Sequence, residues 1–249
     1  MPSCESCGRK AGIKRPGIFF IVALLCGLPA AGQSLSVLPV NILLTPGQKA
    51  TSLTVTNQGN SETAIQIRAF SWSQTSGDDQ LTPSDAVIVS PPLATIGPGA
   101  TQVVRLILRQ GPQDREATYR ILVDQIPPPV EPGTVHIVLR MSIPIFAQPT
   151  IRVAPHLQFH IERNAGSAFL VAYNDGAHHE KIRDVTLWTN DGQKLNTSSN
   201  ASPYILAGAT RRWPIEAKDS LPLPSETLRL TAHADAGAIE QQVRVVAPQ

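Results

Sequence analysis

The feature that most constrains this chain is a run of alternating side chains over Val135–Phe146. Its odd-numbered positions are all apolar: Val135, Ile137, Leu139, Met141, Ile143 and Ile145. Strict alternation is typical of a β-strand with one apolar face, and this run is about twice the modal strand length. Pro144 has no N–H for a ladder, which argues against a fully paired central strand. A long apolar strand near a sheet edge tends to aggregate unless something covers it, so the run raises the possibility of a partner that pairs there.

Residues 1–32 have the features of a secretory signal peptide. Basic residues between positions 9 and 15 form a charged head, residues 18–28 are apolar, and positions 30–32 are small residues suited to cleavage. The apolar run is shorter than the ~18 residues that a membrane span needs, and no other span is visible. We therefore expect an exported mature chain with no membrane insertion.

Removal of this leader changes the charge and the cysteine count. The leader holds four of the 21 Lys and Arg residues and one of the 19 Asp and Glu residues, which leaves 17 against 18, a formal charge of 17 − 18 = −1. This balance gives no electrostatic support for nucleic-acid binding. All three cysteines, Cys4, Cys7 and Cys26, lie in the leader, so the mature protein would have no thiol.

The composition and the turn signals predict an all-β protein of two domains. Prolines are frequent, charge is low and no long helical periodicity appears. About seven strand-like runs precede residue 149, the count of an immunoglobulin-like sandwich. After Ala147-Gln148-Pro149 a second set of strand-like runs begins. We expect an N-terminal domain over residues 33–149 and a smaller β-domain over residues 150–249.

Enzyme motifs are missing from this sequence. It contains no Gly-x-Ser-x-Gly elbow, phosphate loop or dinucleotide fingerprint. Asp78-Asp79 is interpreted as a solvated hairpin tip rather than a catalytic pair. His156, His160 and His178-His179 are interpreted as structural residues, because no third type of metal ligand accompanies them. We therefore expect no catalytic residue, no metal and no cofactor. An exported hydrolase or metal-binding protein stays open as an alternative function.

Nine fragments, in this order and at these spacings, give the chain a specific resemblance. They are Thr56–Gly59, Gln66–Trp72, Ser90–Pro92, Ile96–Gly99, Val104–Leu106, Tyr119–Pro127, Ser142–Phe146, Asn174–His178 and Tyr204–Gly208. Together they resemble the periplasmic pilus-assembly chaperones of the chaperone–usher type, the PapD-like family. The Tyr-Arg-Ile-Leu-Val-Asp and Ser-Ile-Pro-Ile-Phe segments look like the archaic or σ branch, which serves spore-coat-like fimbriae.

The resemblance implies a fold, a function and partners. The fold would be two immunoglobulin-like sandwiches in an L or boomerang arrangement. The function would be donor-strand complementation, in which the last strand of the first domain completes an unfinished pilin until an outer-membrane usher receives it. By position, Val135, Ile137, Leu139 and Met141 match the donor residues. The partners would be pilin subunits and the usher, and the location would be the periplasm.

The resemblance also implies a basic anchor for the C-terminal carboxylate of the pilin. Typical members use an Arg on the first strand and a Lys on the last, but Asn41 and Pro144 occupy these positions here. The charge must come from elsewhere, and Arg120 is the first candidate because its strand should neighbour the donor strand. Arg140, on the face opposite the donor row, is the second. A guanidinium fork suits a carboxylate because it can bind bidentately.

Two simpler interpretations stay open. The alternating row could be the inner face of an ordinary sandwich, with Arg120 in a surface salt bridge. The protein could also be an exported immunoglobulin-like surface or adhesion module without chaperone activity. Arg68 and Arg105, which also match the family, are interpreted as structural.

Overall fold

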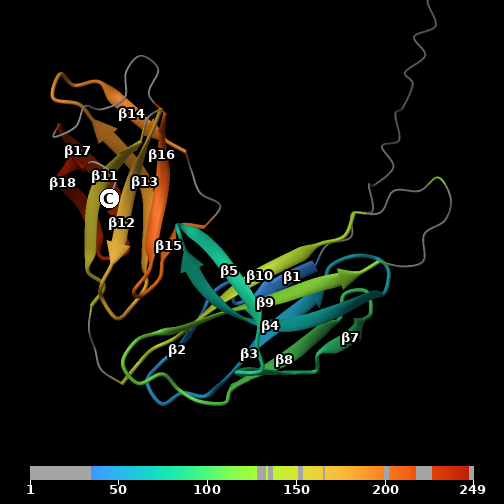
Figure 1. Ribbon diagram of the computed structural model, residues 1–249. Helices are drawn as coiled ribbons and strands as arrows, with labels where there is room; N and C mark the ends of the chain where they lie inside the picture. The colour runs from blue at the N-terminus through green and yellow to red at the C-terminus, as the bar shows by residue number, and fades with distance from the viewer. Residues whose placement is uncertain are drawn as a thin grey trace, which may run out of the picture. The chain divides into compact units, whose positions relative to one another are not determined.

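The computed structural model describes residues 35–127, 133, 137–150, 154–164, 166–198, 202–216 and 226–246. All elements in these residues are β-strands, which confirms the predicted fold class (Figure 1). Within the same residues, no helix has the length and the apolar character that crossing a membrane requires.

The described strands before residue 149 form two sheets around one core. One sheet has the order β1–β3–β8–β6; the other has the order β2–β10–β9–β4–β5, with β7 also paired to β4. The strands are β1 (Leu35–Leu38), β2 (Ile42–Leu44), β3 (Ala50–Asn57), β4 (Thr63–Thr75), β5 (Asp78–Pro83), β6 (Val87–Ser90), β7 (Leu93–Ile96), β8 (Thr101–Leu108), β9 (Ala117–Ile126) and β10 (Arg140–Ala147).

Alternation along the strands decides which side chains enter this first core. In β8, Val104, Leu106 and Leu108 are buried, whereas Val103 and Ile107 between them are exposed. The opposite sheet contributes buried residues of β4, β9 and β10 to the same cluster. Each fully buried aliphatic side chain contributes about 1.5–3 kcal/mol to folding, so the period-two pattern largely dictates the sandwich.

The hairpin between β4 and β5 corrects one sequence prediction. Its turn is Ser76-Gly77, and both residues have positive φ, 54° and 92°. Two positive φ angles suit a two-residue turn whose twist matches the flanking strands. Asp78 and Asp79 are therefore not the tip of the hairpin but the first residues of β5, where Asp79 lies opposite Gln74.

The strand predicted over Val135–Phe146 is shorter in the structure. β10 begins at Arg140 and pairs with β9 from Arg140 to Ala147. Residues 137–139 are described but have no ladder partner, and Val135 lies outside the described residues. The prediction of a strand was therefore wrong for residues 137–139. Alternation predicts an extended backbone, but it does not show whether a neighbouring strand lies alongside to pair with it.

The described strands after residue 154 form a second sandwich with its own core. Its sheet has the order β14–β16–β12–β11–β18–β17–β13–β15, and a further β13–β14 pairing closes the order on itself. The strands are β11 (Leu157–Asn164), β12 (Ser167–Asn174), β13 (Glu180–Trp188), β14 (Lys194–Thr197), β15 (Tyr204–Ile205), β16 (Thr210–Glu216), β17 (Thr227–Ala234) and β18 (Gly237–Val246). The core contains Trp213 and aliphatic residues of most of these strands. The domain boundary near residue 149 stays a prediction.

Candidate partner-binding site

The exposure of the predicted donor residues decreases along the chain toward the core of the first sandwich. Ile137 is 80% exposed, a large value for an isoleucine. Leu139 and Met141 are half-buried, and Met141 packs against the first core. Ile143 and Ile145, which continue the same row, are buried in that core. The row is therefore shared between the chain's own interior and the solvent.

Only part of β10 has neighbours on both sides. β9 pairs with its whole length, but β2 pairs only with Ile145, Phe146 and Ala147, in parallel. Over Arg140–Pro144, no strand of the described residues pairs with the side away from β9. This part of β10 is an edge, and its backbone groups on that side can pair with another chain.

Gln125 holds the residue just before β10 in place. Its backbone N–H donates to the carbonyl of Leu139 at 2.9 Å, and its Oε1 accepts from the N–H of Leu139 at 3.2 Å. Beyond Leu139, Ile137 and Val138 are both exposed. Leu139 is thus the point at which the chain leaves the sheet in the direction of the predicted donor residues.

Arg140, the second candidate for the carboxylate anchor, already has an anionic partner. Its Nε donates to Asp124 in a short contact, and Arg68 donates to the same carboxylate with Nη2 at 2.8 Å and Nε at 3.1 Å. Burial alone raises the pKa of Asp124, but hydrogen bonds from Arg140 and Arg68, with their charges, lower it overall. Arg68 therefore has the structural role that the sequence suggested.

Arg120, the first candidate, lies on β9 opposite Pro144 of β10 and Phe70 of β4. Its guanidinium carbon lies 3.7 Å from the centre of the Trp72 ring, and its Nη2 donates to Ser202 Oγ at 3.5 Å. Among the described residues no carboxylate forms an ion pair with Arg120. Burial lowers the pKa of this half-buried guanidinium, and the charge of Arg211 lowers it further, against the opposing effect of Asp79 and Tyr204.

The surroundings of Arg120 come from both sandwiches. Trp72 and Phe146 of the first sandwich form a buried cluster with Tyr204, Leu206 and Ala209 of the second. The Trp72 and Tyr204 rings meet edge to face at 5.7 Å, and the Trp72 and Phe146 rings are 5.8 Å apart. This packing makes Trp72 a residue of the contact between the sandwiches.

The two positions of the usual anchor carry no charge in this fold. Asn41 is exposed in the loop between β1 and β2. Pro144 is buried within β10 and faces Arg120 across the β9–β10 ladder. Arg120 thus lies directly opposite the strand position at which typical members carry the Lys.

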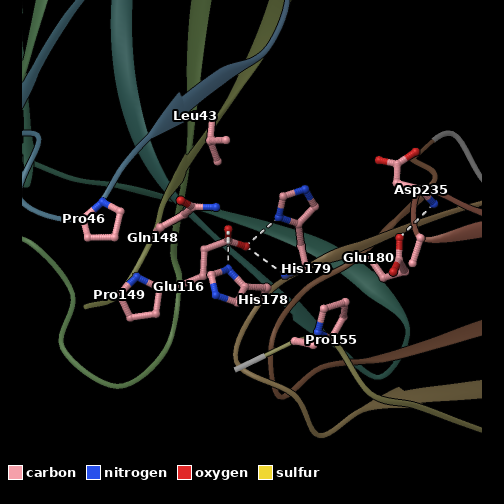
Figure 2. A pocket seen from close by; sticks show the side chains of 12 residues that line it. Leu43, Pro46, Glu116, Gln148, Pro149, Pro155, His178, His179, Glu180 and Asp235 are labelled. Atoms are coloured by element: carbon pink, nitrogen blue, oxygen red, sulfur yellow. Dashed lines mark hydrogen bonds and ion pairs between the residues drawn. The ribbon is translucent and has the colours of Figure 1, made fainter. Parts of the chain in front are cut away.

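A cleft of about 630 Å³ lies between β2, the ends of β9 and β10, and the 176–180 segment of the second sandwich. Figure 2 shows Glu116 at its centre, pointing at His178 and His179. The side chain of Glu116 is 0% exposed; its Oε2 accepts the backbone N–H of His179 at 2.9 Å and lies 2.6 Å from Nδ1 of His179. Nδ1 of His178 lies 3.6 Å from Oε1 of Glu116.

Four of the histidines lie close to carboxylates. His156 contacts Asp175 at 2.5 Å, His160 contacts Glu162 at 3.4 Å, and His178 and His179 share Glu116. Within the described part of the chain, no group of three or more His, Cys, Asp or Glu residues could hold a metal ion. A structural role for these histidines is consistent with these contacts.

Sequence reasoning missed the polar residues that join the two sandwiches. Asp79, assigned to a solvated hairpin tip, accepts from Nη1 of the buried Arg211 at 2.9 Å. That tip assignment is wrong because β5 carries Asp79 to the second sandwich, where Gln74 of the same hairpin also bonds the carbonyl of Tyr204 and the N–H of Leu206. No motif marks these residues, since each partner is 130 or more positions away.

Comparison with known proteins identifies the family. Residues 34–151 match the family described as "Pili and flagellar-assembly chaperone, PapD N-terminal domain". Residues 34–151 therefore form a domain of this PapD-like family of pilus-assembly chaperones. The resemblance found in the sequence is therefore confirmed. This is a family of assembly chaperones rather than of enzymes.

Two curated relatives support the assignment to the PapD-like family. The chain is 26% identical over 144 residues to the chaperone protein FimB/FhaD of Bordetella pertussis, which covers 54% of this chain and 56% of that protein. It is 31% identical over 107 residues to the uncharacterized fimbrial chaperone YbgP of Escherichia coli K12, which covers 41% of this chain and 42% of that protein. The chain thus matches about half the length of these relatives.

Solved structures of PapD-like chaperones have the same two-domain fold. A chain of the CsuC–CsuE chaperone–tip adhesion subunit pre-assembly complex, from the archaic chaperone-usher Csu pili of Acinetobacter baumannii, aligns with a TM-score of 0.65 at 21% identity, over 87% of this chain and 100% of that chain. A chain of the SafA pilin–SafB chaperone complex of Salmonella enterica aligns with a TM-score of 0.56 at 16% identity, over 86% and 96% of the two chains.

Proposed function

We propose that this protein is a periplasmic chaperone that caps pilin subunits by donor-strand complementation and delivers them to an outer-membrane usher. The observation that carries the proposal is Ile137, an isoleucine that is 80% exposed in the segment leading into the edge region of β10. An exposed apolar residue next to unpaired backbone is unfavourable unless a partner strand covers both.

The donor segment would act through backbone and side chains together. The edge of β10 over Arg140–Pro144 offers backbone hydrogen bonds that do not depend on the partner's sequence. Ile137, Leu139 and Met141 would enter apolar pockets of the pilin, and Val135, outside the described residues, would be the fourth donor. Burial of Ile137 would contribute about 1.5–3 kcal/mol before the entropic cost of association.

Arg120 is the better of the two candidates for the carboxylate anchor. It is half-buried and has no carboxylate partner among the described residues, so an arriving carboxylate would relieve an uncompensated charge. Arg140 already shares Asp124 with Arg68, and its side chain is largely exposed. We therefore propose Arg120 as the anchor and rank Arg140 second, in agreement with the order expected from the sequence.

The location and the partners follow from the family and the sequence. Residues 1–32 are proposed as the cleaved signal peptide, residues 33–149 as the domain that carries the donor segment, and residues 150–249 as the second domain. The fold match to a chain of the Csu complex, which comes from an archaic chaperone-usher system, supports the archaic branch. A tip adhesion subunit in that complex and a pilin in the SafB complex make a pilus subunit the natural partner here.

Co-expression with cognate pilin subunits tests the proposal. The wild-type chain should form a one-to-one complex with pilin in periplasmic extracts, and Ile137→Asp should abolish it because a charge cannot enter an apolar pocket. Val103→Asp is the matched control, because Val103 is also an exposed β-branched aliphatic residue, 51% accessible, but lies on β8. It should leave the complex intact.

Two results would overturn the proposal. One is soluble, monomeric pilin in cells that lack this protein; the other is equal pilin capture by Ile137→Asp and wild type. Retention of the protein on the cell exterior, measured by surface labelling, would instead favour the exported immunoglobulin-like surface module.

A further inference from the structure

A buried asparagine fixes one corner of the first sandwich. Asn57 is the last residue of β3, and its Nδ2 donates to the carbonyls of Ser61 at 2.7 Å and Ile96 at 2.9 Å. Its Oδ1 accepts the N–H of Gly59 at 2.9 Å. One side chain thus joins the loop after β3 to the end of β7.

The second sandwich repeats this contact atom by atom. Asn174 is the last residue of β12 and is also buried; its Nδ2 donates to the carbonyls of His178 at 2.8 Å and Ile205 at 3.1 Å. Its Oδ1 accepts the N–H of Gly176 at 3.0 Å. The third partner is again the isoleucine that ends a short strand, here β15. The two sandwiches are therefore built on one plan.

The strands around each asparagine correspond one to one. The antiparallel pairs β3–β8, β4–β7, β4–β9 and β9–β10 recur as β12–β16, β13–β15, β13–β17 and β17–β18. This correspondence makes β18 the counterpart of β10. The end of β18 also pairs in parallel with β11, as the end of β10 pairs in parallel with β2.

The beginning of β18 is an edge, as the beginning of β10 is. β11 and β18 lie side by side (Figure 1), but they share ladder positions only over residues 161–162 and 245–246. Among the described residues, no strand pairs with residues 157–160 on the side of β18, or with residues 237–244 on the side away from β17. We call these two unpaired stretches the seam. Their backbone groups can pair with an added strand.

A groove of about 230 Å³ opens at the seam. Leu157 and Phe159 of β11 and Ile239 of β18 line it; all three are half-buried and pack against the second core. A cavity of about 150 Å³ holds a benzene molecule, so this groove has room for one or two aliphatic side chains. The donor segment projects Ile137 into solvent, whereas the seam is concave and suited to receive side chains.

A buried carboxylate in the groove has no cationic partner. Glu180 lines the groove, and its Oε1 accepts the backbone N–H groups of Lys181 and Asp235, both at 3.0 Å. Within the described part of the chain, no Lys or Arg side chain lines the groove or pairs with Glu180. A buried charge is unfavourable without a counterion, so the groove is complementary to one Lys or Arg side chain.

We infer that the seam is a strand-addition site for an extended partner segment with aliphatic side chains at alternate positions and a Lys or Arg at one end. Its backbone would pair with the edge of β18, its aliphatic side chains would enter the groove, and its cation would meet Glu180. This inference goes beyond the proposed function, because the seam lies outside the donor segment and does not depend on pilin capture.

Synthetic peptides test the seam directly. The probe is a peptide of about ten residues in which valine alternates with threonine and a lysine ends the chain, the pattern that strand addition selects. One control peptide has the same composition with its valines consecutive; the other has glutamate in place of lysine. Titration into the ¹⁵N-labelled protein, followed by NMR, should shift the amide signals of residues 157–160 and 237–242. Each control peptide should bind about tenfold more weakly.

Variants of the protein separate the two parts of the site. Glu180→Gln keeps an oxygen for the two backbone N–H groups but removes the charge, so the lysine and glutamate peptides should then bind equally. Ile239→Asp should abolish binding of all three peptides, because it places a charge in the groove. Ile107→Asp is the matched control, because Ile107 is an exposed isoleucine of β8, which is paired on both sides. It should bind like the wild type.

Three results would overturn the inference. The first is amide shifts confined to β9 and β10, which would mean that the peptide recognises the donor edge only. The second is equal affinity for the alternating and the consecutive peptides. The third is an unchanged preference for lysine over glutamate in Glu180→Gln, which folds as the wild type does when its amide spectrum is otherwise the same.

Discussion

At the scale of single residues, Asp124 determines how the start of β10 is held. It is on β9, its side chain is 13% exposed, and it receives hydrogen bonds from Arg68 of β4 and Arg140 of β10. One carboxylate thus ties three neighbouring strands together at the position where the donor segment leaves the sheet. Both arginines are considerably exposed, so each contact is partly screened by solvent.

Asp124→Asn should lower the free energy of unfolding by about 1 kcal/mol at pH 7. The pKa of Asp124 is lowered in the fold from its ordinary value of 3.8, because hydrogen bonds from Arg140 and Arg68 outweigh its burial. The stabilisation is therefore complete above the unfolded pKa and disappears as the pH falls through the folded pKa. Urea unfolding of variant and wild type should differ at neutral pH and converge in acid.

A difference between Asp124→Asn and wild type that persists unchanged below about pH 2 would contradict this account. Glu62→Gln serves as the control at neutral pH, because Glu62 is exposed and should change the stability by less than about 0.5 kcal/mol.

At the scale of elements, the apolar row of β10 is buried in the core at one end of the strand and continues into solvent before the other end. Its end is an interior strand between β9 and β2, and Ile145 is fully buried there. Its beginning is an edge, and the row continues into solvent at Ile137. Because the strand has period two throughout, the same alternation that fills the chain's own core also lines up the residues proposed for the partner.

Truncation along the row should therefore separate stability from binding. Ile145→Ala should lower the free energy of unfolding by about 2–5 kcal/mol, because it opens a cavity in a packed core. Ile137→Ala should change it by less than about 0.5 kcal/mol, because the side chain contacts little. Denaturant unfolding of both variants measures the contrast. Equal destabilisation by the two would show that residue 137 belongs to the chain's own core.

At the scale of the whole molecule, the contact between the sandwiches is built from polar pairs around an aromatic cluster. Arg211–Asp79 and Glu116–His179 each join a residue of one sandwich to a residue of the other. The His179 ring also stacks on Phe146, with ring centres 3.5 Å apart. Arg120 lies in this contact, so the proposed anchor depends on the relationship between two domains.

Glu116→Ala should destabilise the protein strongly. The carboxylate is fully buried, and its removal leaves the backbone N–H and the ring of His179 without their partner. We expect a loss of about 3 kcal/mol in the free energy of unfolding, measured by urea denaturation. Asp114→Ala is the matched control, because Asp114 is an exposed carboxylate two positions away. Equal stability of the two variants would contradict a structural role for Glu116.

The sequence alone determined the fold class, the two sets of strands and most inward-facing residues, because alternation is a local property that each strand carries by itself. It also ranked Arg120 before Arg140 as the anchor, but it could not show which of the two already has a carboxylate partner. The tertiary structure decided that Arg140 is paired with Asp124, that β10 begins at Arg140, and that Asp79 meets Arg211 132 positions away. These features depend on neighbours brought together from distant parts of the chain, and no local pattern encodes such contacts.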